Sequence, residues 1–253
     1  MSRTRLAYGP EPEQFGHLYL PDTVDPGTPI PVVMVVHGGF WHGRYHLNLG
    51  TPLALALSRN GVAAWNIEYR RIGAGGRWPE MSVDVVAALE AVATLVADRA
   101  AAVGITLDLD RVRVVGHSAG GQLAVWLAGE PAAVRPQLVV SQAGALDLAS
   151  AGERGRRIDY IEDLFGVAYE DDPELYRSAS PLHRVPVGVP VAVVHGTEDA
   201  QVRVNVATRY ADAARAAHDP VSLHVIDGED HYAFLDKSTR SWALSLELLL
   251  DER

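Results

Sequence analysis

A serine framed by glycines is the first feature of this sequence that could do chemistry. Residues 111–129 read RVRVVGHSAGGQLAVWLAG, where a valine-rich run leads into GHSAG and then into an apolar pattern with helical spacing. A strand, a tight turn and a helix are the context that a G-x-S-x-G nucleophile turn requires. The glycines let strand and helix approach closely, and the helix N-terminus offers N–H groups and partial positive charge to an oxyanion. The pattern predicts that Ser118 is a nucleophile.

A serine hydroxyl needs a base to take its proton and a carboxylate to orient that base. The run VAVVHGTEDAQV places Asp199 just past one β-rich apolar run, and VIDGEDHYAFL places His231 past the next. In an open α/β sheet, strand ends of this kind converge on one crevice. We therefore predict His231 as the base and Asp199 as the acid, because a helical pattern follows Asp199. Asp147, Glu198 and Asp230 are alternative acids, Asp147 being the strongest of the three.

A second glycine-rich loop, HGGFWHGRYH at residues 37–46, follows directly on the buried apolar run PVVMVV. Acyl transfer through a serine forms a tetrahedral oxyanion, which needs preorganised N–H donors. In sites of this type one donor follows the nucleophile and the other comes from an early glycine loop. Phe40 stands at the third position in place of a glycine, which alters the shape of the pocket more than the backbone donors. The residues expected to form the oxyanion hole are Gly38, Gly39, Phe40 and Ala119.

Aromatic residues of this loop and of later segments are candidates for binding the substrate. Together they would make an aromatic mouth suited to an aryl group, and a bulky Phe40 agrees with a small acyl pocket. Aromatic residues at such places also serve as plain core, and the sequence does not separate the two roles. The candidates are Phe40, Trp41, Tyr45, Trp78, Tyr160 and Phe165.

Neither a metal nor a cofactor is expected. His37, His42 and His46 share one loop, but no carboxylate cluster accompanies them there and their spacing fits no helical ligand face. The chain has no cysteine, which excludes a thiolate metal site, a disulfide framework and a cysteine nucleophile. Hydrolysis through an acyl-enzyme needs only water in its second half.

Charge and hydropathy limit the partners. The chain has 253 residues, 48% of them apolar, with 22 basic and 32 acidic residues and a net charge of −10. The charges are spread along the chain, which argues against nucleic acid and anionic membrane as partners. No apolar run approaches the roughly 18 residues that a membrane span requires, so a cytoplasmic location is expected. The sequence does not indicate an oligomeric state.

Short β-rich runs alternate with longer helical patterns, which is typical of βαβ units and a mostly parallel sheet with helices on both faces. We expect one α/β domain over residues 1–253. A polar, proline-containing stretch at about 150–186 interrupts the rhythm and is expected to be a small lid insertion. The expected strands are 15–20 as an outer strand and 32–36, 62–67, 112–115, 138–141, 191–194 and 223–226 as inner ones. Helices are expected from Thr51 to Asn60 and over 79–103, 205–217 and 232–250.

With these motifs in view, the chain resembles the α/β-hydrolases, within the esterase and lipase branch that carries HGG loops. HGGFW is similar to the HGG-x-W motif of the kynurenine formamidase (arylformamidase) group and its carboxylesterase relatives, and GHSAGGQLA is similar to their nucleophile elbow. The resemblance runs nearly end to end and implies Ser118, Asp199 and His231 as a catalytic triad. Glu68-Tyr69-Arg70 is similar to a scaffold motif of those families, which implies a structural aspartate on the next helix, Asp84.

The expected function is therefore a serine hydrolase of small carboxylic esters or aryl amides, with a small molecule that can carry an aromatic group as its partner. A peptidase similar to the catalytic domain of prolyl oligopeptidases is an alternative, disfavoured because the chain has no room for a propeller domain. A hydrolase-fold binding protein without turnover is a second alternative, and transferase or lyase chemistry from the same residues also stays open.

Overall fold

The structure is a computed structural model that describes residues 2–150 and 159–251. Eight strands form its centre. They are β1 (Ser2–Ala7), β2 (Phe15–Leu20), β3 (Ile30–Val36), β4 (Ala63–Ile67), β5 (Leu107–His117), β6 (Leu138–Gln142), β7 (Val191–Gly196) and β8 (Val221–Ile226).

The strands make one sheet in the order β1-β2-β4-β3-β5-β6-β7-β8. Strands β1, β2 and β4 pair antiparallel, and every later pair is parallel. The mostly parallel α/β sheet predicted from the sequence is confirmed. Its parallel strands carry their carboxyl ends to one edge, which is where open α/β sheets hold their ligands.

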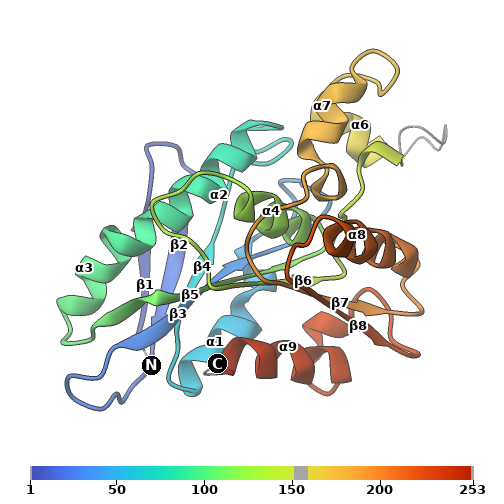
Figure 1. The fold of residues 1–253 in the computed structure, drawn as a ribbon. Coiled ribbons are helices and arrows are strands. Elements are labelled where there is room, and N and C mark those ends of the chain that lie inside the picture. Colours follow the sequence, from blue (N-terminus) through green and yellow to red (C-terminus); the bar gives the residue numbers. More distant parts are fainter. Residues whose placement is uncertain (1, 151–158, 252–253) are drawn as a thin grey trace.

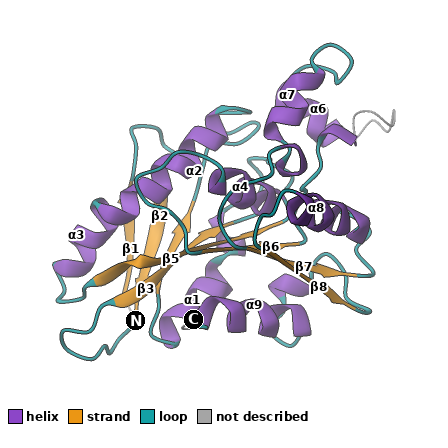
Figure 2. Ribbon diagram, in the orientation of Figure 1, coloured by secondary structure: helices purple, strands orange, loops and turns teal. Residues whose placement is uncertain are grey.

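Helices cover both faces of this sheet (Figures 1 and 2). Helices α1 and α9 lie on one face, and α2, α3, α4 and α8 lie on the other. The helices are α1 (Thr51–Arg59), α2 (Glu80–Glu90), α3 (Leu95–Ala101), α4 (Ala119–Ala128), α6 (Asp159–Phe165), α7 (Pro173–Ala179), α8 (Val204–Ala216) and α9 (Arg240–Leu250). Short 3-10 helices span Leu47–Leu49, Ala91–Ala93, Pro181–His183 and Ala233–Leu235.

The expected insertion at 150–186 is described only in part, because residues 151–158 lie outside the described residues. Its described portion holds α6 and α7, which stand beyond the helical layer of α4 and α8 in Figure 1. Ile161 and Leu164 of α6 are buried and belong to the core cluster on this face of the sheet. The described helices of this segment are therefore packed onto the domain. Whether they act as a lid stays a prediction.

Several expected elements differ from the structure. The helix expected over 232–250 begins only at Arg240, after a separate 3-10 helix. Strand β1 was not predicted, because its alternate residues Arg3 and Arg5 are exposed and leave little apolar signal. It occupies the sheet edge, so β2 is not the outer strand. At the other edge, β8 has a partner on one side only and is largely half-buried, where an inner strand was expected. The single helix expected over 79–103 divides into α2 and α3, with a break at Thr94, whose backbone is non-helical.

The backbone segments at the turn between β5 and α4 pack very closely. A Cβ atom at Gly116 would lie 2.0 Å from the carbonyl oxygen of Gly120. A Cβ atom at Gly120 would lie 2.2 Å from the carbonyl oxygen of Val36, at the end of β3. Only glycine at both positions allows the helix to start directly against two neighbouring strand ends.

We expect the substitution Gly116→Ala to lower the free energy of unfolding by about 2–3 kcal/mol, because the new methyl group must displace main chain. Gly129→Ala is the matched control, since Gly129 has right-handed backbone and its nearest neighbour would be 3.5 Å from the new Cβ atom. Urea denaturation of both variants checks this. An equal loss of unfolding free energy in the two variants would show that the close approach at Gly116 is not the reason why the turn requires glycine.

Candidate active site

The serine of the GHSAG motif lies between β5 and α4, directly before the first residue of the helix. Its backbone has φ 55° and ψ −116°, outside the regions that L-residues ordinarily adopt. The turn is held from both sides, because the Ser118 N–H donates to the Gln142 carbonyl at 2.8 Å and the Gln122 N–H donates to the Ser118 carbonyl at 3.1 Å. A strained, fixed backbone of this kind is typical of functional sites. Ser118 is 7% exposed and lines a cavity.

Asp199 and His231 meet at the ends of β7 and β8. The Nδ1 atom of His231 lies 2.7 Å from Oδ2 of Asp199, and both side chains are buried. Because a carboxylate can only accept, Nδ1 carries a hydrogen, and in the neutral form of the ring Nε2 then has the lone pair. This is the tautomer that a general base acting through Nε2 requires.

The Asp199 carboxylate is fully hydrogen-bonded. Its Oδ1 accepts from the N–H groups of Gln201 and Val202 at 2.8 and 2.7 Å. Its Oδ2 accepts from His231 and also lies 3.2 Å from Nε2 of His195. Burial would raise the pKa of Asp199, but the hydrogen bonds from the two histidines outweigh it and hold the pKa well below its usual range. Asp199 is thus a carboxylate at any ordinary pH.

The three alternative acids lie elsewhere. Asp147 pairs with Arg209 at 2.6 Å, and Asp230 accepts from the N–H of Tyr232 at 2.9 Å. Neither of them, nor Glu198, contacts the ring of His231 among the described residues. The structure therefore brings only Asp199, of the four candidates, to His231.

His117 ties the serine turn to the histidine loop. Its Nε2 donates to the carbonyl oxygen of His231 at 2.8 Å, and the two rings lie 4.8 Å apart. Burial, with the nearby His231, lowers the pKa of His117 to about 3, so this ring is neutral. The described residues show no hydrogen bond between the Ser118 hydroxyl and the His231 ring. Such bonds are often long before substrate binds.

The HGG loop lies against the serine turn. A Cβ atom at Gly38 would lie 2.6 Å from the His117 carbonyl oxygen, which explains why a glycine is needed there. Phe40 and Trp41 both have positive φ, 55° and 57°. In the described part of the chain no acceptor pairs with the N–H groups of Gly39, Phe40 or Ala119. These are three of the four residues expected to form the oxyanion hole, Gly38 being the fourth, and that role stays a prediction.

A buried carboxylate holds this loop from below. Oε1 of Glu68 lies 2.6 Å from Nε2 of His37 and also pairs with Arg71, while Oε2 accepts from the Leu47 N–H at 3.0 Å. The other His37 nitrogen, Nδ1, lies 2.7 Å from the Gly38 carbonyl oxygen, so both ring nitrogens are within hydrogen-bonding distance of an oxygen atom. Burial would raise the pKa of Glu68, but the hydrogen bond and charge of His37, with Arg71, lower it below its usual range.

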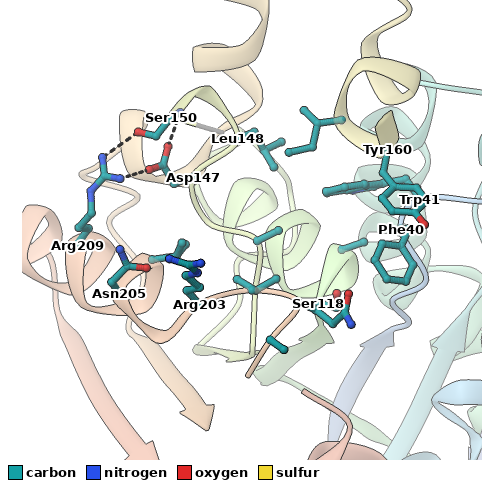
Figure 3. Close-up of a pocket in the computed structure, with 17 residues that line it drawn as sticks. Phe40, Trp41, Ser118, Asp147, Leu148, Ser150, Tyr160, Arg203, Asn205 and Arg209 are labelled. Carbon is teal, nitrogen blue, oxygen red and sulfur yellow. Dashed lines mark hydrogen bonds and ion pairs between the residues drawn. The ribbon is translucent and has the colours of Figure 1, made fainter. Parts of the chain in front are cut away.

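The cavity beside Ser118 has a volume of about 420 Å³. Figure 3 shows Phe40, Trp41 and Tyr160 together on one side of it, and the rings of Phe40 and Tyr160 lie 4.6 Å apart. Trp41 is fixed there because its Nε1 donates to Oε1 of Gln122 at 3.0 Å. The lining comprises Phe40, Trp41, Ser118, Ala119, Ala145, Asp147, Leu148, Ser150, Tyr160, Ile161, Ala200, Gln201, Val202, Arg203, Asn205, Val206 and Arg209.

Half of the predicted aromatic mouth lies elsewhere. Trp78 and Phe165 are buried in the core, where Trp78 packs edge-on against Trp126 at 5.0 Å and against Phe165 at 6.3 Å. Tyr45 lies behind Phe40, 6.1 Å from its ring, and the cavity lining does not include it. No motif distinguishes Trp78 and Phe165 from the aromatic residues that line the cavity, so the sequence could not separate core from cavity here.

Sequence reasoning also missed residues that the structure brings to the site. Arg203, Asn205 and Arg209 reach the cavity from the start of α8, and no motif marks them. Glu68 carried a signal, since it precedes the Tyr-Arg pair of the scaffold motif. The implied structural aspartate is present, because Arg70 pairs with Asp84 at 2.7 Å and its N–H donates to the same carboxylate.

No group of three or more potential metal ligands occurs within residues 2–150 and 159–251. No helix in these same ranges is both long and apolar enough to cross a bilayer.

Known proteins match both the sequence and the fold. The BD-FAE family profile matches residues 17–213. Esterase LipC from Mycobacterium tuberculosis (strain ATCC 25618 / H37Rv) is 31% identical in an alignment of 232 positions, which covers 85% of this chain and 55% of that protein. The chain thus spans about half the length of this curated relative.

Solved structures of esterases share the fold. The butyrate-bound Est2 esterase of Thermogutta terrifontis superimposes with a TM-score of 0.76 at 19% identity, covering 97% of this chain and 91% of that one. A truncated carbohydrate esterase from gut microbiota gives a TM-score of 0.80 at 18% identity, covering 98% and 95%. At these identities the likeness establishes the α/β-hydrolase fold and nothing finer.

Because Glu68 is a buried carboxylate paired with the Arg71 guanidinium, we expect Glu68→Gln to lower the free energy of unfolding by about 3 kcal/mol near neutral pH. The pKa of Glu68 is lower in the folded than in the unfolded chain, so its contribution is present above the unfolded pKa of about 4.3 and is lost as pH falls through the folded pKa. The difference between wild type and variant should therefore shrink on acidification.

Urea denaturation at about pH 7.5 and about pH 4 measures this difference. The control is Glu174→Gln, because Glu174 is an exposed carboxylate 3.9 Å from Arg177 and its loss should change stability by less than about 0.5 kcal/mol. A Glu68 effect that is the same at both pH values would contradict the ionised, paired carboxylate.

Proposed function

Because the chain belongs to the BD-FAE family and has the α/β-hydrolase fold, we propose that it is a serine hydrolase of small carboxylic esters. The observation that carries the proposal is the pair formed by His231 Nδ1 and Asp199 Oδ2 at 2.7 Å, at the sheet edge where Ser118 lines a cavity. A nucleophile, an oriented imidazole and a buried carboxylate together serve nucleophilic acyl transfer. A binding protein has no need of this combination.

In the proposed mechanism the Ser118 oxygen attacks the ester carbonyl while Nε2 of His231 takes the hydroxyl proton. The resulting imidazolium is stabilised by the Asp199 carboxylate, which does not itself take a proton. The N–H groups of Ala119 and of the HGG loop stabilise the oxyanion. His231 then returns the proton to the leaving group, and water repeats the sequence on the acyl-enzyme.

The site also suits an amide of the formamide type, because the same steps cleave an activated C–N bond. Phe40 occupies the wall beside the oxyanion donors, where it limits the size of the acyl group, and a formyl or acetyl group needs little space. Trp41 and Tyr160 extend this wall with flat, apolar surface. We therefore propose small acyl groups, with an ester preferred over an aryl formamide on the strength of the esterase relatives.

We expect Ser118→Ala to lower kcat/KM for phenyl acetate by about 10⁴-fold or more, since the acyl-enzyme can no longer form. The measurement compares phenyl acetate with N-formylkynurenine on wild type and variant. Preference for the formamide by about two orders of magnitude, roughly 2.7 kcal/mol of discrimination, would replace the ester assignment by a formamidase one. Activity that persists in the variant would contradict the serine mechanism altogether.

We expect Phe40→Ala to widen acyl-chain tolerance, raising the ratio of kcat/KM for phenyl hexanoate to that for phenyl acetate by about tenfold, because removing the ring opens the acyl wall. Phe165→Ala is the control, as it truncates a buried phenylalanine that does not line the cavity. It should lower stability and leave the ratio unchanged. If the hexanoate-to-acetate ratio of kcat/KM is unchanged in Phe40→Ala, the proposal that Phe40 limits the size of the acyl group is wrong.

A further inference from the structure

The cavity beside Ser118 has two unlike ends. The aromatic wall of Phe40, Trp41 and Tyr160 comes from the loop after β3 and from α6. In Figure 3 Asp147, Ser150, Asn205 and Arg209 lie at the opposite end, and Arg203 lies between them and Ser118. This second end, which we call the α8 end, holds every charged side chain in the described lining: Asp147, Arg203 and Arg209.

Two of these three charges already satisfy each other. Nη1 of Arg209 lies 2.6 Å from Oδ2 of Asp147, and Nη2 of Arg209 donates to the Ser150 hydroxyl at 2.9 Å. The other Asp147 oxygen accepts from the Ser150 N–H at 3.0 Å. Arg209 is thus held by the protein itself. The carboxylate of Asp147 offsets its positive charge.

Arg203 is different. It stands at the N-cap of α8 with an exposed side chain, and its guanidinium makes no hydrogen bond or ion pair with another described residue. With Asp147 negative and Arg203 and Arg209 positive, the described lining of the α8 end has a net charge of +1, whereas the whole chain has a net charge of −10. A guanidinium is a planar fork of N–H donors that matches a carboxylate in two parallel hydrogen bonds.

We propose that Arg203 is a specificity-determining residue that binds a carboxylate on the leaving group of the substrate. The inference rests on the proposed function and deepens it, because it names the substrate class of the same site. With the acyl group against Phe40, the leaving group extends toward the α8 end, where Arg203 meets it. The favoured substrates are then small acyl esters of hydroxy acids, such as aryl esters with a carboxylate remote from the scissile bond.

The test compares 4-acetoxybenzoate with its neutral counterpart 4-acetoxybenzamide. These two esters differ in intrinsic reactivity, so the quantity measured is the ratio of their kcat/KM values, compared between wild type and variants. We expect Arg203→Gln to lower kcat/KM for the anionic ester about five- to tenfold and that for the neutral ester less than about twofold. The loss should fall in KM, because a remote carboxylate is bound equally in ground and transition states.

Two further variants sharpen the test. Arg203→Lys keeps the charge without the fork and should retain part of the preference. Arg215→Gln removes the same charge from an exposed position on the same helix, outside the cavity lining, and should leave the ratio unchanged. The wild-type preference should also weaken as salt is added.

An unchanged ratio in Arg203→Gln, or an equal loss with both esters, would overturn this inference. A ratio lowered to the same extent by Arg215→Gln would overturn it too, since a general field effect would then explain the preference. Failure of the proposed function has a different signature, namely hydrolysis of both esters that survives in Ser118→Ala. The two failures are therefore distinguishable in one set of assays.

Discussion

The close approach of Gly116 to Gly120 is the constraint on which the rest of the site depends. It starts α4 directly at the end of β5 and leaves Ser118 at φ 55° with its side chain in the cavity wall. The contact of Gly120 with the Val36 carbonyl extends the constraint to β3. The HGG loop leaves β3 at this point, so the serine turn and the expected oxyanion donors are positioned by one backbone junction.

Two buried carboxylates stabilise the loops that this junction brings together. Glu68 accepts from His37, Arg71 and the main chain below the HGG loop, and Asp199 accepts from His231, His195 and the main chain beyond β7. In each case the donors offset the cost of burying the charge and lower the pKa. Each carboxylate therefore has two roles, because it orients a histidine ring and also holds the main chain of the loop around it.

The sequence predicted what motifs and strand periodicity encode. Runs of apolar residues predict the sheet type and most strand positions. The loops that follow two of these runs predict the pairing of Asp199 with His231. It could not predict which aromatic residues face the cavity. Nothing in the sequence around Trp78 and Phe165 separates them from Phe40, and only their packing with α4 and α6 shows that they belong to the core. Nor could it predict β1, whose exposed arginines hide the strand.

The segment from β7 into α8 carries both the proposed catalytic acid and the proposed leaving-group site. Asp199 binds His231 with one oxygen, and with the other it accepts from Gln201 and Val202, the two residues before Arg203. The proposed acid thus fixes the backbone of the loop that presents the α8 end of the cavity. Since His195 also binds the Val202 carbonyl at 2.7 Å, this loop is held from two sides. A change in the length of this loop would move both the proposed acid and Arg203. The same loop therefore positions the His231 imidazole and the proposed leaving-group site.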